Sequence, residues 1–199
     1  MARMRHPRFK KCRSLGLNVC GHPKAMKRAD NGQSREKRKL SPYGIQLLEK
    51  QRLKCYYEVM EKQFRRYVKE AMKDNEMTGD SLIRKLECRL DNMVYRMNFG
   101  SSIREARQMV THGHMEVNGK KVDIPSFALS VGDIVTLRQK SRKNEVYREN
   151  FMEKAFNTVS YVEIDKENFS AVLVKKVERS EVPIEIKDHL VVELYSKIM

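Results

Sequence analysis

Positively charged side chains are the residues of this chain whose types and spacing could do chemistry, and many lie between Leu86 and Val122. That segment reads LECRLDNMVYRMNFGSSIREARQMVTHGHMEVNGKKV. Arginine and lysine bind phosphate through charge-assisted hydrogen bonds. We therefore expect the segment to bind nucleic acid. The side chains that we place at its surface for that purpose are Arg89, Arg96, Arg104, Arg107, Gln108, His112, His114, Asn118, Lys120 and Lys121.

Catalytic chemistry finds little support in the same residues. The chain contains no GxxxxGK[ST] phosphate loop, no GxGxxG fingerprint and no HExxH zinc motif. Asp91 lies within RLDN, where we expect it to pair with a neighbouring arginine rather than act as a catalytic acid. His112 and His114 flank Gly113, and we expect RNA contact or capping of a helix end from them, because no nucleophile partner is implied. We expect no catalytic residue.

Metal binding is a sharper question, because Cys12 and Cys20 lie near His6 and His22. Zinc sites usually hold two thiolates in a C-x₂₋₄-C pair, and the spacing here is C-x₇-C. We therefore expect no metal ligand and no cofactor. The remaining cysteines, Cys55 and Cys88, have apolar neighbours typical of a core, and we expect all four to be reduced thiols.

The elements that must position these cations begin with an amphipathic helix. We predict that Ser81 caps this helix and that it breaks at Phe99 and Gly100. Apolar residues recur along this helix at helical spacing, and the stripe that they form is predicted to be buried. That stripe consists of Leu82, Leu86, Leu90, Val94 and Met97.

A second helix and a hairpin should follow. Ser102 with Glu105 three residues later is a capping box, and Gly113 suits a left-handed helix stop. Asn118-Gly119 is a strong signal for a two-residue hairpin turn. Further on, Ile134–Leu137 predicts a strand, and residues 138–150 predict a loop or a short helix. Residues 151–199 alternate between apolar and polar, which predicts short strands or a strand with a terminal helix.

The net charge of +15 is unevenly distributed over the 199 residues. Residues 1–40 carry +11, residues 41–150 carry +6, and residues 151–199 carry −2. Phosphate neutralisation with release of counterions is the physical use of such a bias. A solvated basic surface kept for solubility is the alternative, and binding to a membrane surface is less favoured. No apolar run approaches the roughly 18 residues of a membrane span, and no secretory segment is recognisable, so we expect a cytoplasmic protein without a membrane partner.

The first forty residues are basic and punctuated by glycine. Alone they should be largely disordered and should become ordered on RNA. The alternative is that Leu15, Leu17 and Val19 pack locally. The RNA-binding residues that we assign here are Arg3, Arg5, Arg8, Lys10, Lys11, Arg13, Lys24, Lys27, Arg28, Arg35 and Arg38.

Two groups of cations accompany the helical stretch from Ser41 to Lys73. Ser41 is a good N-cap with Pro42 in the first turn, and Arg52 interrupts the apolar stripe, which indicates two helices or one with a polar break. We expect cations of the first half to contact mRNA or ribosomal RNA, and cations of the second half to face phosphates. These residues are Lys50, Arg52 and Lys54, and then Lys62, Arg65, Arg66 and Lys69.

Over nearly its whole length the chain resembles the bacterial ribosomal protein S-four family. The resemblance is carried by LSPYGIQLLEKQRLK from Leu40, MEKQFRRY from Met60, RLDNMVYRMNFG from Arg89, VNGKKVDIPS from Val117 and PIEIKDHLVVELYSK from Pro183. It implies an α+β fold, in which a small α+β RNA-binding module is inserted into a mainly helical domain. The boundaries that we assign are 1–40 for a basic extension, 41–88 for the helical domain, 89–152 for the module, and 153–199 for a C-terminal segment that packs back on the helical domain.

The resemblance also implies a function. Family members are structural constituents of the small ribosomal subunit that bind a multi-helix junction of its RNA early, nucleate assembly, and contribute to translational accuracy near the channel through which mRNA enters. Expected partners are small-subunit ribosomal RNA, neighbouring proteins such as S-five, and mRNA, with the protein present as a monomer. Members carry a four-cysteine zinc knuckle or have replaced it, and this chain keeps only two cysteines there. The alternatives are a free regulatory RNA-binding protein or paralogue that represses translation, and, less favoured, an RNA-modifying enzyme.

Overall fold

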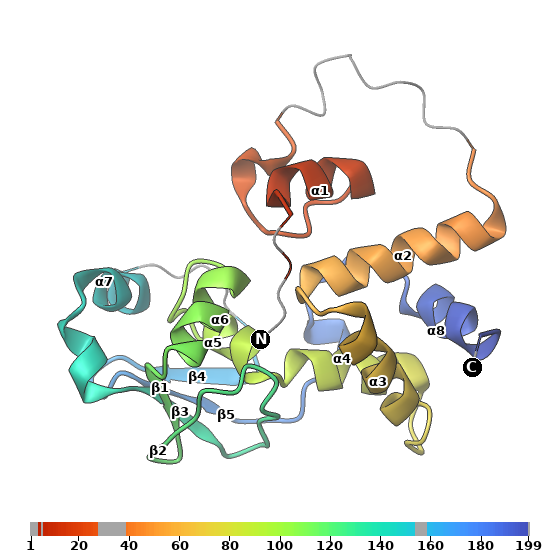
Figure 1. Ribbon diagram of the computed structural model, residues 1–199. Helices are drawn as coiled ribbons and strands as arrows, with labels where there is room; N and C mark the ends of the chain where they lie inside the picture. The colour runs from red at the N-terminus through yellow and green to blue at the C-terminus, as the bar shows by residue number, and fades with distance from the viewer. Residues whose placement is uncertain (1–3, 5, 28–38, 154–158, 199) are drawn as a thin grey trace. The chain divides into compact units, whose positions relative to one another are not determined.

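A computed structural model describes residues 4, 6–27, 39–153 and 159–198 of the chain (Figure 1). These residues form two compact units. Unit 1 contains Met1–Ile83 and Ile184–Met199, and unit 2 contains Arg84–Pro183. Five of the cations assigned from the sequence lie outside the described residues. They are Arg3, Arg5, Arg28, Arg35 and Arg38.

The N-terminal part of unit 1 folds around a small core of its own. Helix α1 (Arg8–Leu15) ends at Gly16, whose φ of 64° is left-handed, and a short 3₁₀ helix, η1 (Pro23–Ala25), follows. The expectation of a largely disordered segment is therefore wrong for this stretch, and the alternative of local packing is found. Burial of apolar side chains stabilises it. The core consists of Cys12, Leu15, Val19, Ala25 and, from the next helix, Cys55.

The rest of unit 1 consists of packed helices. Helix α2 (Pro42–Tyr56) begins as predicted, because Ser41 Oγ accepts a hydrogen bond from the Gly44 N–H at 3.2 Å. The stretch is indeed two helices, since α3 runs from Glu61 to Ala71. The break follows Tyr56 rather than falling at Arg52, and it includes a left-handed Glu58. The C-terminal helix α8 (Asp188–Ser196) packs against α2 (Figure 1).

The amphipathic helix predicted from Ser81 to Met97 is two helices. Helix α4 (Thr78–Glu87) begins before Ser81, whose hydroxyl donates to Asp74 instead of capping, and α5 (Leu90–Arg96) follows a break. The break frees the backbone N–H of Leu90 to donate to Phe127 O at 2.8 Å. The loop that contains Phe127 therefore pairs with the chain at Leu90, although the apolar periodicity around Leu90 predicts a continuous helix.

Unit 2 is built on an antiparallel sheet of five strands in the order β2-β1-β3-β5-β4. Helices α5 and α6 (Ile103–Thr111) lie over one face of the sheet (Figure 1). The predicted hairpin is present, since Asn118 and Gly119 have φ of 50° and 75°. The strands are β1 (Met115–Val117), β2 (Lys120–Lys121), β3 (Ile134–Leu137), β4 (Val162–Asp165) and β5 (Ser170–Leu173).

The charged stretch after β3 is helical. It forms a 3₁₀ helix, η2 (Gln139–Lys143), and then α7 (Glu145–Glu153). Phe151 of α7 is buried and stacks on Phe99, with ring centroids 4.4 Å apart. A last 3₁₀ helix, η3 (Arg179–Glu181), precedes the return of the chain to unit 1.

The C-terminal boundary differs from the one assigned from the sequence. We expected the segment from residue 153 onward to pack on the helical domain, but β4 and β5 extend the sheet of unit 2, and the chain rejoins unit 1 only at Ile184. The physical reason is that Ala171 and Leu173 are buried in the sheet, where Ala171 faces Val135 across the strands. The α+β class, with a small module in a helical domain, is confirmed.

None of the helices in the described parts of the chain combines the length and the apolarity that crossing a membrane requires.

Candidate RNA-binding surface

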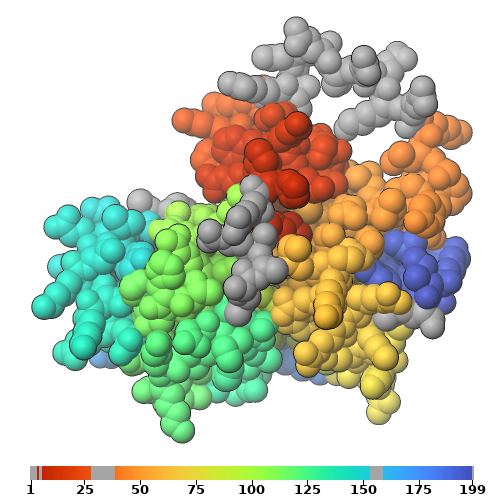
Figure 2. Space-filling model, in the orientation of Figure 1, coloured from red at the N-terminus to blue at the C-terminus, as the bar shows by residue number. Residues whose placement is uncertain are grey.

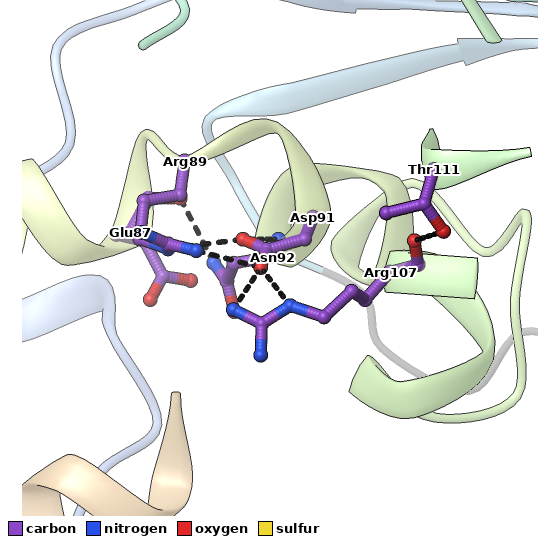
Figure 3. A network of polar contacts seen from close by, with 6 residues as sticks. All are labelled: Glu87, Arg89, Asp91, Asn92, Arg107 and Thr111. Atoms are coloured by element: carbon purple, nitrogen blue, oxygen red, sulfur yellow. Dashed lines mark hydrogen bonds and ion pairs between the residues drawn. The ribbon is translucent and has the colours of Figure 1, made fainter. Parts of the chain in front are cut away.

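A buried network of charges lies under the surface of unit 2 (Figure 3). Asp91 Oδ1 and Oδ2 accept from Arg89 Nε at 3.0 Å and Nη2 at 2.7 Å, and Oδ2 also accepts from Arg107 Nε at 2.9 Å. The side chains of Arg89 and Asp91 are each 1% exposed, and that of Arg107 is 13% exposed. Asp91 thus ties the start of α5 to α6, which confirms that it pairs with arginine.

A second buried ion pair joins α4 to α5. Arg96 Nε donates to Glu87 Oε1 at 2.5 Å, and the Tyr161 hydroxyl donates to the same oxygen at 2.6 Å. The sequence placed Arg89 and Arg96 at the surface, and the structure shows that placement to be wrong. Buried arginines need acidic partners, and Asp91 and Glu87 supply them. These two arginines therefore form buried ion pairs inside the module.

The exposed part of the module begins on α6. Ser102 Oγ caps the helix by accepting from Glu105 N at 3.3 Å, as predicted, while Glu105 Oε2 reaches back to Ser101 N at 2.7 Å. Gln108 is exposed and Arg104 is half-buried. This helix therefore presents polar side chains at its outer surface while Ala106, Met109 and Val110 pack inward.

The turn after α6 gathers several polar groups. Gly113 has φ of 71°, and a Cβ built there would collide with Lys121 Cε, so the Lys121 side chain occupies the space that glycine leaves. Arg138 Nη1 donates to Gly113 O at 3.1 Å. His114 Nδ1 lies 2.9 Å from Ser141 Oγ, and His112 is exposed beside it. Burial, with contributions from His112 and Arg138, lowers the pKa of His114 below its ordinary value.

Asn118 has a structural role in the hairpin. Its Nδ2 donates to Asp133 at 2.8 Å, and its Oδ1 accepts from Ile134 N at 3.0 Å. Lys120 is exposed at the hairpin tip. The sequence assignment missed Arg138 and the cations of η2. Their signal was the basic run LRQKSRK, which we assigned only as a loop or short helix.

Helix α3 carries an exposed row of cations in unit 1. Lys62, Arg65 and Lys69 are exposed, and no carboxylate in the described residues forms an ion pair with them. Arg66, also exposed, pairs with Glu70 at 2.8 Å. Atoms of α3 (gold) reach the surface on the face shown in Figure 2. The opposite side of α3 buries Phe64, Val68 and Ala71.

The three cations assigned to α2 are engaged within the protein. Lys50 and Lys54 each lie 2.9 Å from a Glu61 oxygen, and their side chains are 13% and 15% exposed. Arg52 donates to Glu49 at 2.6 Å and to Leu15 O at 2.9 Å. From the sequence we expected these cations to contact mRNA or ribosomal RNA. In the structure they hold α1 and α3 against α2.

Glu61 is the residue of α3 that both Lys50 and Lys54 contact. Burial alone would raise the pKa of Glu61, but hydrogen bonds from Lys54, Lys50 and Tyr195 outweigh it and lower the pKa to about 2. The Tyr195 hydroxyl of α8 donates to Glu61 at 2.9 Å. The carboxylate therefore links three helices of unit 1.

The α1 region presents further cations. Lys10, Lys24 and Lys27 are exposed, and Lys11 and Arg13 are half-buried. Arg8 is half-buried with its guanidinium 5.2 Å from the Phe9 ring centre. These side chains surround the small core and are available for phosphate contacts.

Cys12 and Cys20 lie in contact in that core. Burial first, and then the hydrogen bond with Cys20, raises the pKa of Cys12 to about 11, so Cys12 is a thiol at neutral pH. His22 Nδ1 accepts from Lys24 N at 3.1 Å. Within residues 4, 6–27, 39–153 and 159–198, no three or more His, Cys, Asp or Glu side chains converge as a metal site would require.

Comparison with known proteins gives a consistent result along the chain. A profile described as "Ribosomal protein S4/S9 N-terminal domain" matches residues 3–87, and one described as "S4 domain" matches residues 88–135. The chain is 54% identical over 199 residues to small ribosomal subunit protein uS4 of Finegoldia magna, covering 99% of this chain and 100% of that protein.

Other relatives agree. The chain is 52% identical over 197 residues to small ribosomal subunit protein uS4B of Clostridium acetobutylicum, covering 99% of this chain and 100% of that protein. It is 48% identical over 162 residues to small ribosomal subunit protein uS4 of a Thermoanaerobacter species, covering 81% of this chain and 78% of that protein.

Proposed function

Because this chain belongs to the family of small ribosomal subunit protein uS4, we propose that its exposed cations bind small-subunit ribosomal RNA. The protein is a structural constituent of the small ribosomal subunit and not an enzyme. Its place is therefore on cytoplasmic ribosomes. Its RNA-binding module is the region that matches the S4 domain.

The exposed row on α3 is the observation that supports this proposal most directly. Lys62, Arg65 and Lys69 repeat at helical spacing, so their charges repel one another along one stripe. The two carboxylates of the helix offset little of this, since Glu61 is held by Lys50 and Lys54, and Glu70 pairs with Arg66. Such a stripe becomes favourable when phosphates lie opposite it.

We extend the proposal to a specific role. The protein binds a multi-helix junction of the RNA early and as a monomer, nucleates assembly, and contacts neighbouring small-subunit proteins, among them S-five. It lies near the channel through which mRNA enters and contributes to translational accuracy. The family resemblance supports this role. Contact with mRNA cannot rest on Lys50, Arg52 and Lys54, because these cations are engaged inside unit 1.

Binding to naked small-subunit ribosomal RNA tests the proposal. Replacing Lys62, Arg65 and Lys69 by Glu should weaken binding at least about tenfold at 0.1 M salt and flatten the salt dependence, because three phosphate contacts are lost. The matched control replaces Lys166, Lys176 and Lys187 by Glu, which makes the same change in net charge. These three lysines belong to the acidic C-terminal part of the chain. Equal loss in both variants would contradict a specific role for α3.

Assembly provides the second readout. Wild-type protein should remain with the small subunit through a high-salt wash, and it should bind the naked RNA without any other protein. A protein that leaves the subunit in salt would favour the alternative of a free regulatory protein. Equal affinity for an unrelated duplex RNA of the same length would contradict binding to a specific junction.

A further inference from the structure

The turn between α6 and β1 brings four basic or titratable side chains together from three elements. His112 and His114 flank Gly113, with ring centroids 6.0 Å apart. Arg138 reaches the same turn from the end of β3, donating through its side chain to Gly113 O and through its backbone N–H to His114 O at 2.9 Å. Lys121 reaches it from β2, lying against Gly113.

The positions of these groups are fixed by the fold. His114 is held between the Ser141 hydroxyl, 2.9 Å from Nδ1, and the Tyr147 ring, 5.2 Å away between centroids. Ser141 belongs to η2 and Tyr147 to α7, so the packing of the charged stretch after β3 sets the imidazole orientation. His112 is exposed and Lys121 is half-exposed, so the cluster opens to solvent.

We propose that His112, His114, Arg138 and Lys121 form a phosphate-binding site in which RNA binding is coupled to proton uptake. The inference rests on the proposed function, since the phosphate is that of the RNA backbone. Imidazolium, guanidinium and ammonium donors that converge on one turn are the groups that bind phosphate through charge-assisted hydrogen bonds.

The charges around His114 explain why protons accompany the phosphate. In the free protein the pKa of His114 is lowered first by burial and then by the charges of His112 and Arg138. A phosphate anion at the turn reverses that balance and favours the protonated imidazole. Affinity should therefore fall as pH rises from the lowered pKa of His114 in the free protein to its higher pKa in the complex.

Two carboxylates lie beside the cluster, each near one of its cations. Glu116 pairs with Arg138 at 3.2 Å, and Asp123 lies 3.7 Å from Lys121 with both side chains at least half exposed. Burial and, to a smaller extent, the charge of Glu105 raise the pKa of Tyr147. The basic residues of η2, the helix that contains Ser141, are Lys140, Arg142 and Lys143.

The test compares the dissociation constant for full-length small-subunit ribosomal RNA at pH 6.0 and pH 8.0, at constant ionic strength. Wild-type protein should bind about fivefold more tightly at pH 6.0, since uptake of one proton changes affinity by at most about tenfold per pH unit. His114→Asn keeps a polar group toward Ser141 and should reduce the pH effect to less than about twofold. His189→Asn, in the α8 helix of unit 1, is the matched control and should keep the full effect.

Calorimetry of RNA binding at pH 7, in two buffers of different ionisation enthalpy, supplies a measurement that needs no variant. Net proton uptake by wild-type protein supports the proposal, and uptake of no protons overturns it. A pH effect retained in a folded His114→Asn variant also overturns it. Absence of RNA binding at either pH would instead contradict the proposed function, so the two failures are distinguishable.

Discussion

Replacement of Asp91 by Asn should destabilise unit 2 strongly. The Asp91 carboxylate is 1% exposed and accepts from Arg89 Nε and Nη2, from Arg107 Nε and Nη2, and from Asn92 N, at 2.7 to 3.0 Å. The amide can accept at one atom only and carries no charge, so the buried Arg89 guanidinium loses its carboxylate partner. Removing one partner of a buried pair costs about 3–5 kcal/mol, which is a large part of the stability of a small domain.

Native-state hydrogen exchange of the α5 and α6 amides is the suitable assay, because it reports the opening of unit 2 separately from unit 1. Asp123→Asn is the matched control, since Asp123 and its partner Lys121 are 57% and 50% exposed and 3.7 Å apart. Its loss should be at most about 1 kcal/mol. A loss below about 1 kcal/mol for Asp91→Asn would refute the reasoning that this buried charge network supports the module.

Three further predictions follow from the same structure. Because the pKa of Glu61 is lowered to about 2, its contribution to the stability of unit 1 is present above about pH 4.5 and is lost as pH falls toward 2. The melting temperature should therefore decline more steeply from pH 6 to pH 2.5 for wild type than for Glu61→Gln. Gly113→Ala should cost about 1–2 kcal/mol and displace Lys121, because the left-handed backbone disfavours a Cβ there; a melting temperature unchanged by the substitution would contradict this. Purified protein should contain no stoichiometric zinc, and replacing Cys12 and Cys20 by Ser should leave RNA binding near normal; one zinc per chain by elemental analysis would reverse that expectation.

Most local signals in the sequence predicted the local structure, although Ser81 does not cap α4. Ser41 and Ser102 cap helices, and Asn118-Gly119 turns a hairpin, because each depends on residues within three or four positions. The family resemblance supplied the α+β architecture and the inserted module. These features need no knowledge of distant partners.

Long-range pairing decided what the sequence could not. Arg89 lies off the apolar stripe of a continuous helix, and only the break after Glu87, where residues 125–129 pair with the chain, turns it inward. Likewise Lys50 and Lys54 look free until Glu61 of the following helix is placed against them. Apolar and polar residues alternate along β4 and β5, which predicts strands. That β5 pairs with β3, and β4 with β5, depends on tertiary contacts that this alternation does not specify.

The packing of α8 against α2 has a consequence for the order of events during synthesis. All of unit 2 is translated between the two parts of unit 1, so at about 5–20 residues per second the module can fold on the ribosome while unit 1 is incomplete. Until α8 emerges, Glu49 lacks the Lys187 N–H and Glu61 lacks the Tyr195 hydroxyl. A prematurely terminated copy therefore cannot complete the helical unit that presents the α3 cations, and unfinished chains would be poor competitors for the RNA.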